Sequence, residues 1–238
     1  MKTYFNWSGG KDSSIALFRM MEAGNTPELL LTSVNAMHNR VSMHGVRREL
    51  LEIQTMETGI PLETLELPEQ PDMNTYNTLM GEKMNSLKQR GFSKAVFGDI
   101  FLEDLKKYRE EKLAAAGIEA VFPIWKEDTR SLAEYFINEG FKAIIVCVNE
   151  RWLDSSFCGR ELDHSFLNDL PPDVDPCGEN GEFHSYVYAG PVFRNAIPVK
   201  KGALVHRTYP VPSGNDADNC YTTPVKEQYG FYFQDLLL

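Results

Sequence analysis

The sequence predicts an α/β fold in which helices cover both faces of a parallel β-sheet, followed by a smaller α+β region. Short apolar runs alternate with amphipathic segments through about the first 150 residues, a pattern typical of parallel strands buried on both faces. Several amphipathic segments also end in glycine, as helices do at their C-caps. Beyond about residue 150, glycine and proline interrupt the pattern, so we expect a less regular region there.

The first strand is expected over Thr3–Trp7, directly before a glycine turn. Further strands of the parallel sheet are expected over Leu29–Val34, Leu62–Leu67, Ala95–Phe97, Ala120–Ile124 and Ala143–Val148. The helices between them are expected near residues 13–22, 45–58, 75–90, 102–116 and 130–139. The later region is expected to form strands over Phe183–Tyr188, Ala203–Tyr209 and Phe231–Leu236, with a flexible polar loop over Pro212–Asn219.

We expect two domains, a larger one over residues 1–128 and a smaller one over residues 129–238. The net charge of -10 argues against a general nucleic-acid-binding surface, which needs clustered Lys and Arg. No run of apolar residues is long enough for a membrane span, and the N-terminus has the pattern of a strand rather than a signal peptide. The four cysteines show no C-x-x-C spacing, which favours free thiols in a reducing cytoplasm.

The most informative motif is the turn between the first strand and the first helix, Ser8-Gly9-Gly10-Lys11-Asp12-Ser13-Ser14. A helix start offers unpaired N–H groups and the positive end of the helix dipole, so it suits a phosphate. The glycines let the backbone approach the anion, Lys11 supplies a cation and the serines supply hydroxyl donors. The spacing differs from the Walker loop, which has four residues between its glycines. The alternative is a tight turn with an N-capping serine.

Two other strand ends carry polar residues that can face the same ligand. Gly98 and Asp99 follow the fourth strand, where they can form a nucleotide pocket wall, or Asp99 can cap the next helix. The loop from Asn35 to His44 follows the second strand. Its backbone can bind the adenine edge, and Arg40 or Arg47 can reach phosphates, although a plain polar loop explains any single residue here. His38 and His44 lack a metal-ligand spacing.

A second cluster spans residues 175–185, Asp-Pro-Cys-Gly-Glu-Asn-Gly-Glu-Phe-His-Ser. Glycines let such a loop fold tightly, so that its side chains converge. Glu179, Glu182 and His184 can orient a nucleophile, hold Mg²⁺ or move protons. Cys177 can be a nucleophile, but a structural cysteine is the favoured interpretation because no activating neighbour is visible in the sequence.

Together, the Ser-Gly-Gly-Lys-Asp-Ser turn, Phe97-Gly98-Asp99-Ile100 and the 175–185 cluster, with Ala189-Gly190-Pro191-Val192-Phe193 after it, resemble the diphthine–ammonia ligase family of N-type ATP pyrophosphatases. The resemblance covers most of residues 1–195. Two positions depart from the family pattern: Ser185 replaces Thr, which keeps the hydroxyl, and Ala189 replaces Asp, which removes a carboxylate.

The resemblance implies a Rossmann-like sheet of the adenine nucleotide alpha hydrolase (HUP) type, with ATP and Mg²⁺ as cofactors. It implies that an acceptor carboxylate attacks the α-phosphate of ATP and releases pyrophosphate, after which ammonia displaces AMP and leaves an amide. In that family the acceptor is diphthine, a modified histidine of elongation factor 2. A cytoplasmic protein, with a homodimer as one possible assembly and with no membrane or general nucleic-acid partner, is expected.

The expected site residues fall into four groups. Catalytic roles are expected for Lys11, Glu179, Glu182 and His184. ATP binding is expected from Ser8, Gly9, Gly10, Lys11, Asp12, Ser13, Ser14, Asn35, Gly98 and Asp99. Acceptor binding is expected from Asp175, Cys177, Gly178, Glu179, Gly181 and Glu182, and a Mg²⁺ contact from Asp12. Two alternatives stay open: an enzyme of the same superfamily that acts on tRNA or another small acceptor, and a nucleotide sensor without turnover.

Overall fold

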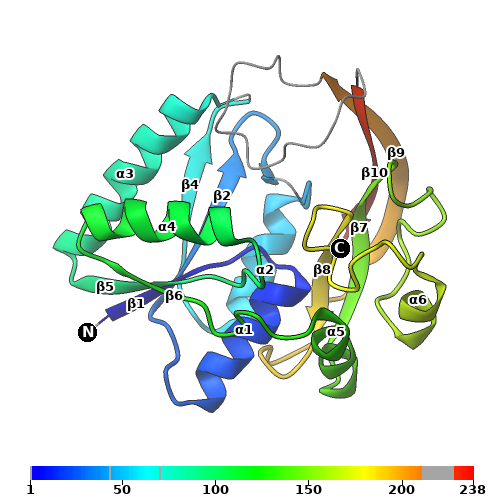
Figure 1. Ribbon diagram of the computed structural model, residues 1–238, viewed down its shortest axis with the longest axis horizontal. Coiled ribbons are helices and arrows are strands. Elements are labelled where there is room, and N and C mark those ends of the chain that lie inside the picture. The colour runs from blue at the N-terminus through cyan, green and yellow to red at the C-terminus, as the bar shows by residue number, and fades with distance from the viewer. Residues whose placement is uncertain (1, 43, 70, 211–227) are drawn as a thin grey trace.

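Two β-sheets lie side by side in the computed structural model, which describes residues 2–42, 44–69, 71–210 and 228–238. Figure 1 shows the sheet of the N-terminal half on the left and the sheet of the C-terminal half on the right. The loop expected over Pro212–Asn219 lies outside the described residues.

The first sheet is built around β1, which pairs in parallel with a strand on either side. Its strands are β1 (Lys2–Asn6), β2 (Leu29–Asn35), β3 (Arg40–Val41), β4 (Leu62–Leu67), β5 (Phe92–Val96) and β6 (Glu119–Val121). The parallel order is β4-β2-β1-β5-β6, and the short β3 pairs antiparallel with the end of β2. The predicted fold class, a parallel sheet flanked by helices with a smaller C-terminal region, is confirmed.

Helices cover both faces of this sheet because neighbouring strand residues point to opposite sides. Phe5 packs with Ile15 of α1 and Leu50 of α2, whereas Tyr4 packs with Leu87 of α3 and Leu113 of α4. These helices are α1 (Lys11–Glu22), α2 (Arg48–Thr58), α3 (Met73–Gln89) and α4 (Glu103–Ala115). Within the described ranges, no helix is long and apolar enough to cross a membrane.

The second sheet is antiparallel, with the order β8-β7-β10-β9. Its strands are β7 (Lys142–Asn149), β8 (Phe183–Ala189), β9 (Lys200–Pro210) and β10 (Gln228–Leu237), and it is accompanied by α5 (Thr129–Asn138) and α6 (His164–Asp169). Placing residues 143–148 in the parallel sheet was therefore wrong. An apolar run buried on both faces shows that a strand is central but carries no information about its direction or its partners.

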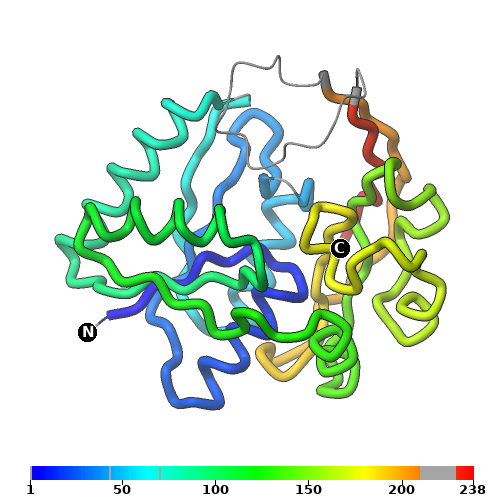
Figure 2. The backbone as a smooth tube through the Cα atoms, in the orientation of Figure 1, coloured from blue at the N-terminus to red at the C-terminus, as the bar shows by residue number. Residues whose placement is uncertain are grey.

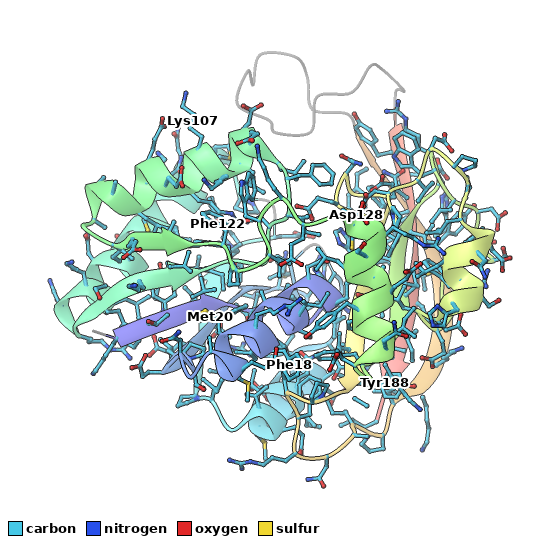
Figure 3. The ribbon with its side chains drawn as sticks, turned by 60° about the horizontal axis from the view of Figure 1, so that its bottom comes forward. Phe18, Met20, Lys107, Phe122, Asp128 and Tyr188 are labelled. Atoms are coloured by element: carbon cyan, nitrogen blue, oxygen red, sulfur yellow. The ribbon has the colours of Figure 1, made fainter. Side chains whose placement is uncertain are left out.

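The chain passes from one sheet to the other at the start of α5, where Asp128 accepts a hydrogen bond from Ser131 N at 2.8 Å. Figure 3 labels Asp128 at the start of α5, with Phe122 on the first-sheet side, and labels Tyr188 of β8 near the opposite end of α5. Figure 2 follows the same path and shows the chain near residue 180 lying between the two halves. The two halves share one buried apolar cluster, which contains Phe5 of β1 and Val187 of β8.

The side chain of Gln54 connects the two sheets directly. Gln54 is fully buried on α2, and its amide donates to the carbonyl oxygens of Gly9 at 2.9 Å and Val187 at 2.7 Å. Its Oε1 accepts from Trp7 Nε1 at 3.0 Å. Val187 N also donates to Gly9 O at 3.0 Å, so the edge strand β8 is fixed to the glycine turn that follows β1.

Replacing Gln54 with leucine should destabilise the protein by about 2–4 kcal/mol, because it leaves the Trp7 N–H unpaired in the interior and removes the hydrogen bonds to the carbonyl groups of Gly9 and Val187. Urea unfolding at neutral pH measures the loss. Gln89→Leu, at the exposed end of α3, is the matched control and should change the unfolding free energy by less than about 0.5 kcal/mol. Equal effects of the two substitutions would contradict the role given to Gln54.

Candidate active site

The glycine turn after β1 is held in shape from several sides. Gly9 adopts φ +78°, a left-handed conformation that favours glycine, and Gly10 is the N-cap of α1. Because Gly10 has no capping side chain, two hydroxyls serve instead: Ser8 Oγ accepts from Gly10 N at 3.2 Å and Ser185 Oγ accepts from Lys11 N at 3.1 Å. The Ser185 hydroxyl thus takes part in holding the start of α1.

The three glycines predicted to bind ATP lie against protein atoms. A Cβ on Gly9 would collide with Gln54 Oε1, and one on Gly10 would lie 2.9 Å from His44 Cε1. A Cβ on Gly98 would lie 3.0 Å from the backbone nitrogen of Ser13. Side chains at these positions would therefore push Gln54, His44 or the first turn of α1 out of place.

The serines of the turn are paired within it. Ser13 and Ser14 are buried, and each hydroxyl donates to the carbonyl oxygen of Gly10 at 2.9 Å. Ser8 Oγ lies 3.0 Å from Ser13 Oγ. These hydroxyls stabilise the start of α1.

Lys11 joins the glycine turn to the loop of residues 175–182 that precedes β8, which we call the acidic loop. Its side chain is only 3% exposed, and its ammonium donates to both carboxylate oxygens of Asp12 at 2.8 Å and to the carbonyl oxygen of Cys177. Burial, the largest single effect, lowers the pKa of Lys11, but Asp12 together with Cys177 and Glu179 raises it above its ordinary value. Lys11 is therefore a fixed positive charge at the start of α1.

The acidic loop is organised by two of its own carboxylates. Asp175 accepts from Cys177 N at 2.9 Å, Glu179 N at 3.2 Å and the Thr129 hydroxyl at 2.7 Å. Glu182 is fully buried and accepts from Asp175 N at 3.1 Å and from both nitrogens of Asn180 at 2.9 and 3.0 Å. In this conformation both carboxylates shape the loop; contact of either with a reactant stays a prediction.

Turns at Gly178, with φ +66°, and Gly181, with φ +83°, let this loop fold back on itself. A Cβ on Gly178 would lie 2.8 Å from the carbonyl oxygen of Phe183. The loop therefore closes against the start of β8, which carries the next residue of the predicted site, His184.

Glu179 points toward the end of β5, where its Oε1 accepts from Ile100 N at 2.8 Å. Burial, together with the negative charge of Asp12, raises its pKa to about 8. Glu179 is therefore poised to gain or lose a proton near neutral pH, as a general acid or base must.

Cys177 is a buried thiol whose Sγ lies 3.2 Å from the carbonyl oxygen of Thr129. Burial raises the pKa of this thiol well above its usual value. A protonated, buried thiol is a poor nucleophile, so the geometry supports the structural interpretation of this cysteine.

His184 stacks on His44, with ring centroids 4.7 Å apart and planes inclined by 22°. His44 comes from the loop before α2, and its Nδ1 lies 3.3 Å from the carbonyl oxygen of Ser185. Two imidazoles from different halves of the chain thus meet beside Gly10.

Other predicted residues are engaged elsewhere. Asn35 donates to the carbonyl oxygen of Glu69 at 3.0 Å and supports its own loop. Asp99 forms an ion pair with Arg109 at 2.8 Å; α4 begins with Leu102 as its N-cap, so the alternative that Asp99 caps that helix was wrong.

The two arginines considered for phosphate contacts both bind Asp235 of β10. Arg40 Nη1 lies 3.0 Å and Arg47 Nη2 lies 2.6 Å from its carboxylate. Their hydrogen bonds, Arg47 first, lower the pKa of Asp235. In this arrangement the arginines fix β10 to the loop before α2.

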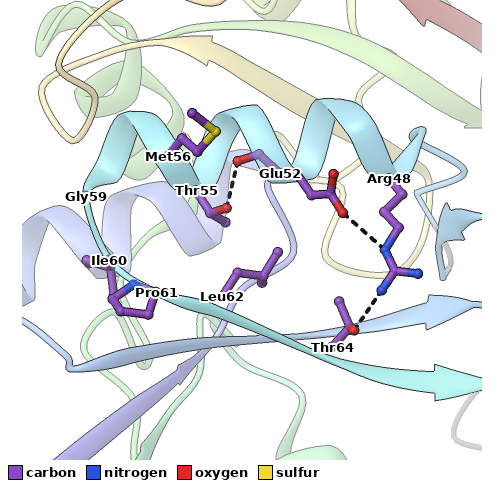
Figure 4. Close-up of a pocket in the computed structure, with 9 residues that line it drawn as sticks. All are labelled: Arg48, Glu52, Thr55, Met56, Gly59, Ile60, Pro61, Leu62 and Thr64. Atoms are coloured by element: carbon purple, nitrogen blue, oxygen red, sulfur yellow. Dashed lines mark hydrogen bonds and ion pairs between the residues drawn. The ribbon is translucent and has the colours of Figure 1, made fainter.

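A surface hollow between α2 and β4 lies apart from these groups (Figure 4). The polar side chains that line it bind one another: Arg48 forms an ion pair with Glu52 at 3.3 Å and donates a hydrogen bond to Thr64 at 2.9 Å. None of the residues that line it belongs to the predicted site, and we assign it no ligand.

Among the described residues, no three His, Cys, Asp or Glu side chains gather as a preformed metal site. Asp12, 26% exposed at the first turn of α1, presents a carboxylate beside the glycine turn. One carboxylate together with phosphate oxygens is a usual way for Mg²⁺ to be held, so the residues fit a metal that arrives with a nucleotide.

Comparison with known proteins gives two family matches that agree with this geometry. The model of the diphthamide synthase N-terminal domain matches residues 1–119, and that of the diphthamide synthase C-terminal domain matches residues 128–209. The chain belongs to the diphthamide synthase family. The first match contains the glycine turn and the second contains the acidic loop, so the two halves of the site correspond to the two domains of this family.

A curated relative of the diphthamide synthase family, a diphthine–ammonia ligase from Danio rerio, is 24% identical over 214 residues, covering 80% of this chain and 83% of that protein. A solved structure described as a predicted subunit of a tRNA methyltransferase from Methanocaldococcus jannaschii matches with a TM-score of 0.43 and 18% identity. That match covers 61% of this chain and 80% of the other.

Two members of the site were not predicted as such. Gln54 occupies the buried stripe of α2 together with Leu50 and Leu51, so a polar residue at a core position was the available signal. His44 was considered as a metal ligand by type and as the end of a polar loop, and no local pattern could pair it with His184, which lies 140 residues away in the sequence of this diphthamide synthase family member.

The raised pKa of Glu179 predicts a pH-dependent stability. Since the pKa in the folded protein is about 8 and the ordinary value is 4.5, the folded state favours the protonated carboxyl. The associated stability is present below about pH 4.5 and is lost as the pH rises to about 8. The unfolding free energy of Glu179→Gln should therefore rise relative to that of the parent by roughly 1 kcal/mol per pH unit across this window.

Chemical denaturation of both proteins at several pH values measures this difference. The matched control is Glu82→Gln on the exposed face of α3, whose difference from the parent should stay constant. If the unfolding free energies of Glu179→Gln and the parent differ by the same amount at every pH between 5 and 8, Glu179 is ionised throughout, which contradicts a pKa of about 8.

Proposed function

We propose that this protein is an ATP-dependent ligase that adenylates a carboxylate, releases pyrophosphate and forms an amide with ammonia. The acceptor is diphthine on elongation factor 2. The supporting observation is the contact of Lys11 with both Asp12 and the Cys177 carbonyl, because it brings a phosphate-binding turn and an acidic loop to one place. The family match favours this function over the tRNA-modifying and sensor alternatives. We place the boundary between the two domains at residue 128.

The glycine turn would bind the phosphates. Its backbone N–H groups, the positive end of α1 and the Lys11 ammonium all favour negative charge. Charge accumulates on the leaving pyrophosphate as the bond to the α-phosphate breaks, and fixed donors in a partly dry site stabilise it most at that point. Gly98 supports the turn by allowing β5 to lie against the first turn of α1.

Asp12 would hold the Mg²⁺ that accompanies ATP, and the metal would neutralise phosphate charge. Its carboxylate now accepts from Lys11. When ATP and Mg²⁺ bind, the Lys11 ammonium would pair with the phosphates and the Asp12 carboxylate with the metal. Two ion pairs with the ligand would then replace the ion pair between Lys11 and Asp12. Asp12 therefore serves either as a direct ligand or through a water molecule.

The acidic loop would receive the acceptor. Glu179, whose pKa of about 8 permits either protonation state at neutral pH, can donate a hydrogen bond to the acceptor carboxylate without repelling it. Asp175 and Glu182 act as positioning residues through the backbone N–H groups that they bind. Gly178, Gly181 and Cys177 contribute the shape and backbone of the acceptor site.

The direct test is a reaction of the protein with Mg-ATP, ammonium chloride and elongation factor 2 that carries diphthine. The expected products are AMP, pyrophosphate and diphthamide in equal amounts, detected by chromatography of the nucleotides and mass spectrometry of the factor. Formation of ADP, or of no nucleotide product with the factor present, would contradict the proposed function.

Lys11→Ala should weaken ATP binding or AMP formation by about 1.5–3 kcal/mol, the range for hydrogen bonds to charged groups. Calorimetric titration with ATP and an AMP assay measure the two effects separately. Lys107→Ala, on the exposed face of α4, removes the same charge away from the site and should behave as the parent. A Lys11→Ala protein that binds and cleaves ATP normally would contradict the role of this lysine.

Asp12→Asn should lose activity more at low Mg²⁺ than at high Mg²⁺, since an amide oxygen is a weaker ligand than a carboxylate. A titration of AMP formation against Mg²⁺ at fixed ATP provides the measurement. An identical fractional loss at every Mg²⁺ concentration would instead assign Asp12 to the structure of the turn.

A further inference from the structure

The stacked pair of His44 and His184 is not explained by ATP binding or by acceptor binding. The two rings approach one another from the loop before α2 and from β8, with centroids 4.7 Å apart. The closeness of His44 to Gly10, where an added Cβ would lie 2.9 Å from Cε1, places the pair beside the start of α1. In the proposed function, this is the region where the α-phosphate and the acyl group meet.

The proton on His44 is placed by its neighbour. The carbonyl oxygen of Ser185 can only accept a hydrogen bond, so the ring nitrogen that faces it at 3.3 Å, Nδ1, carries the proton. Nε2 of His44 then holds a lone pair. Within the described part of the chain, neither Nε2 of His44 nor either ring nitrogen of His184 has a hydrogen-bond partner, so the pair offers unused acceptor nitrogens.

The carboxylates nearby are already engaged. Asp12 pairs with Lys11, Asp175 accepts three hydrogen bonds, and Glu182 accepts three from the backbone and side chain of its own loop. Glu179 accepts one hydrogen bond, from Ile100 N, and the proposed function assigns it to the acceptor carboxylate. Beside it, the two imidazoles combine unused lone pairs with partial exposure.

The last step of the proposed reaction needs such an acceptor. The lone pair of ammonia adds to the acyl carbon, the bond from that carbon to the phosphate oxygen breaks, and AMP leaves with its electron pair. The nitrogen begins with three hydrogens and ends with two, so one proton must go to a base. After addition this nitrogen carries the positive charge, and it gives a proton to a neighbouring base as the amide forms.

We propose, as a refinement that rests on the proposed ligase function, that His44 and His184 form the ammonia site. Their unprotonated nitrogens accept hydrogen bonds from un-ionised ammonia, hold it beside the acyl-adenylate and take up the proton released when it adds. The ligand class is a small, neutral nitrogen nucleophile with N–H donors.

The surrounding charge is consistent with a neutral ligand. Burial lowers the pKa of His44 to about 4, and burial together with His44 and Lys11 lowers that of His184 well below its ordinary value. Both rings are therefore unprotonated at neutral pH. The buried ammonium of Lys11 lowers the pKa of both rings, and the same positive charge disfavours ammonium relative to ammonia.

The experiment uses His44→Ala and His184→Ala with elongation factor 2 bearing diphthine, ATP and ammonium chloride. Three quantities are measured: acceptor-dependent exchange of pyrophosphate into ATP, the KM for ammonium, and the ratio of AMP to amide. We expect exchange within about twofold of the parent, a KM for ammonium at least about tenfold higher (about 1.4 kcal/mol), and AMP in excess of amide because water consumes the adenylate. Added imidazole should restore amide formation.

His206→Ala is the matched control, since this histidine lies on β9, the strand of the second sheet farthest from β8 in its order. His44→Asn and His184→Asn repeat the test if an alanine variant does not fold. Variants with a normal KM for ammonium and a normal AMP-to-amide ratio would overturn the ammonia site.

Two other outcomes also overturn it. A raised KM for ATP with a normal KM for ammonium would mean that the rings contact the nucleotide. Loss of pyrophosphate exchange would place them in the first half-reaction. If the parent protein forms neither AMP nor amide, the proposed function itself fails, and the ammonia site with it.

Discussion

The ammonium of Lys11 is the point at which the two halves of the molecule meet. It is nearly inaccessible to solvent, and its contacts are the Asp12 carboxylate on its own helix and the Cys177 carbonyl from the other sheet. A buried charge is costly unless it is paired and hydrogen-bonded, so this lysine constrains the acidic loop to lie against the start of α1. The contacts of Gln54 and Ser185 with the glycine turn reinforce the same arrangement.

This arrangement explains why the phosphate-binding turn is built from two parts of the chain. A turn with two glycines is poorly ordered by itself, since glycine has more conformational freedom to lose than any other residue. Here β8 supplies a backbone hydrogen bond to Gly9 and a hydroxyl to Lys11 N. The second sheet therefore preorganises the first loop, and binding of a nucleotide need not supply that ordering.

Much of the fold could be predicted from the sequence because its signals are local. Strand, glycine turn and helix follow one another at residues 3–22, and the glycines that end helices lie where the pattern places them. The partner of a strand is not a local property. Residues 143–148 had the apolar character of a central parallel strand, yet β7 pairs antiparallel with β8 and β10.

The same distinction applies to the site. The glycine turn and the acidic loop could be found because each places its chemistry within about ten residues. Three features depend on how β8 and the loop before it pack against the first sheet. They are the contact of the two loops through Lys11, the hydrogen bond from Gln54 to Val187, and the stacking of His44 on His184. No periodicity or spacing in one sequence contains that information. The family match supports the two separate halves, and the geometry adds what connects them.

The coupling of the two loops through Lys11 can be measured by hydrogen–deuterium exchange with and without α,β-methylene ATP, whose α,β linkage resists cleavage. Lys11 donates to the carbonyl of Cys177 as well as to Asp12, so a nucleotide that draws the ammonium to its phosphates also changes the contact with the acidic loop. We therefore predict that the analogue changes the protection of amides in residues 175–182 as well as in residues 8–14. A change confined to residues 8–14, with residues 175–182 exchanging as in the free protein, would contradict the coupling.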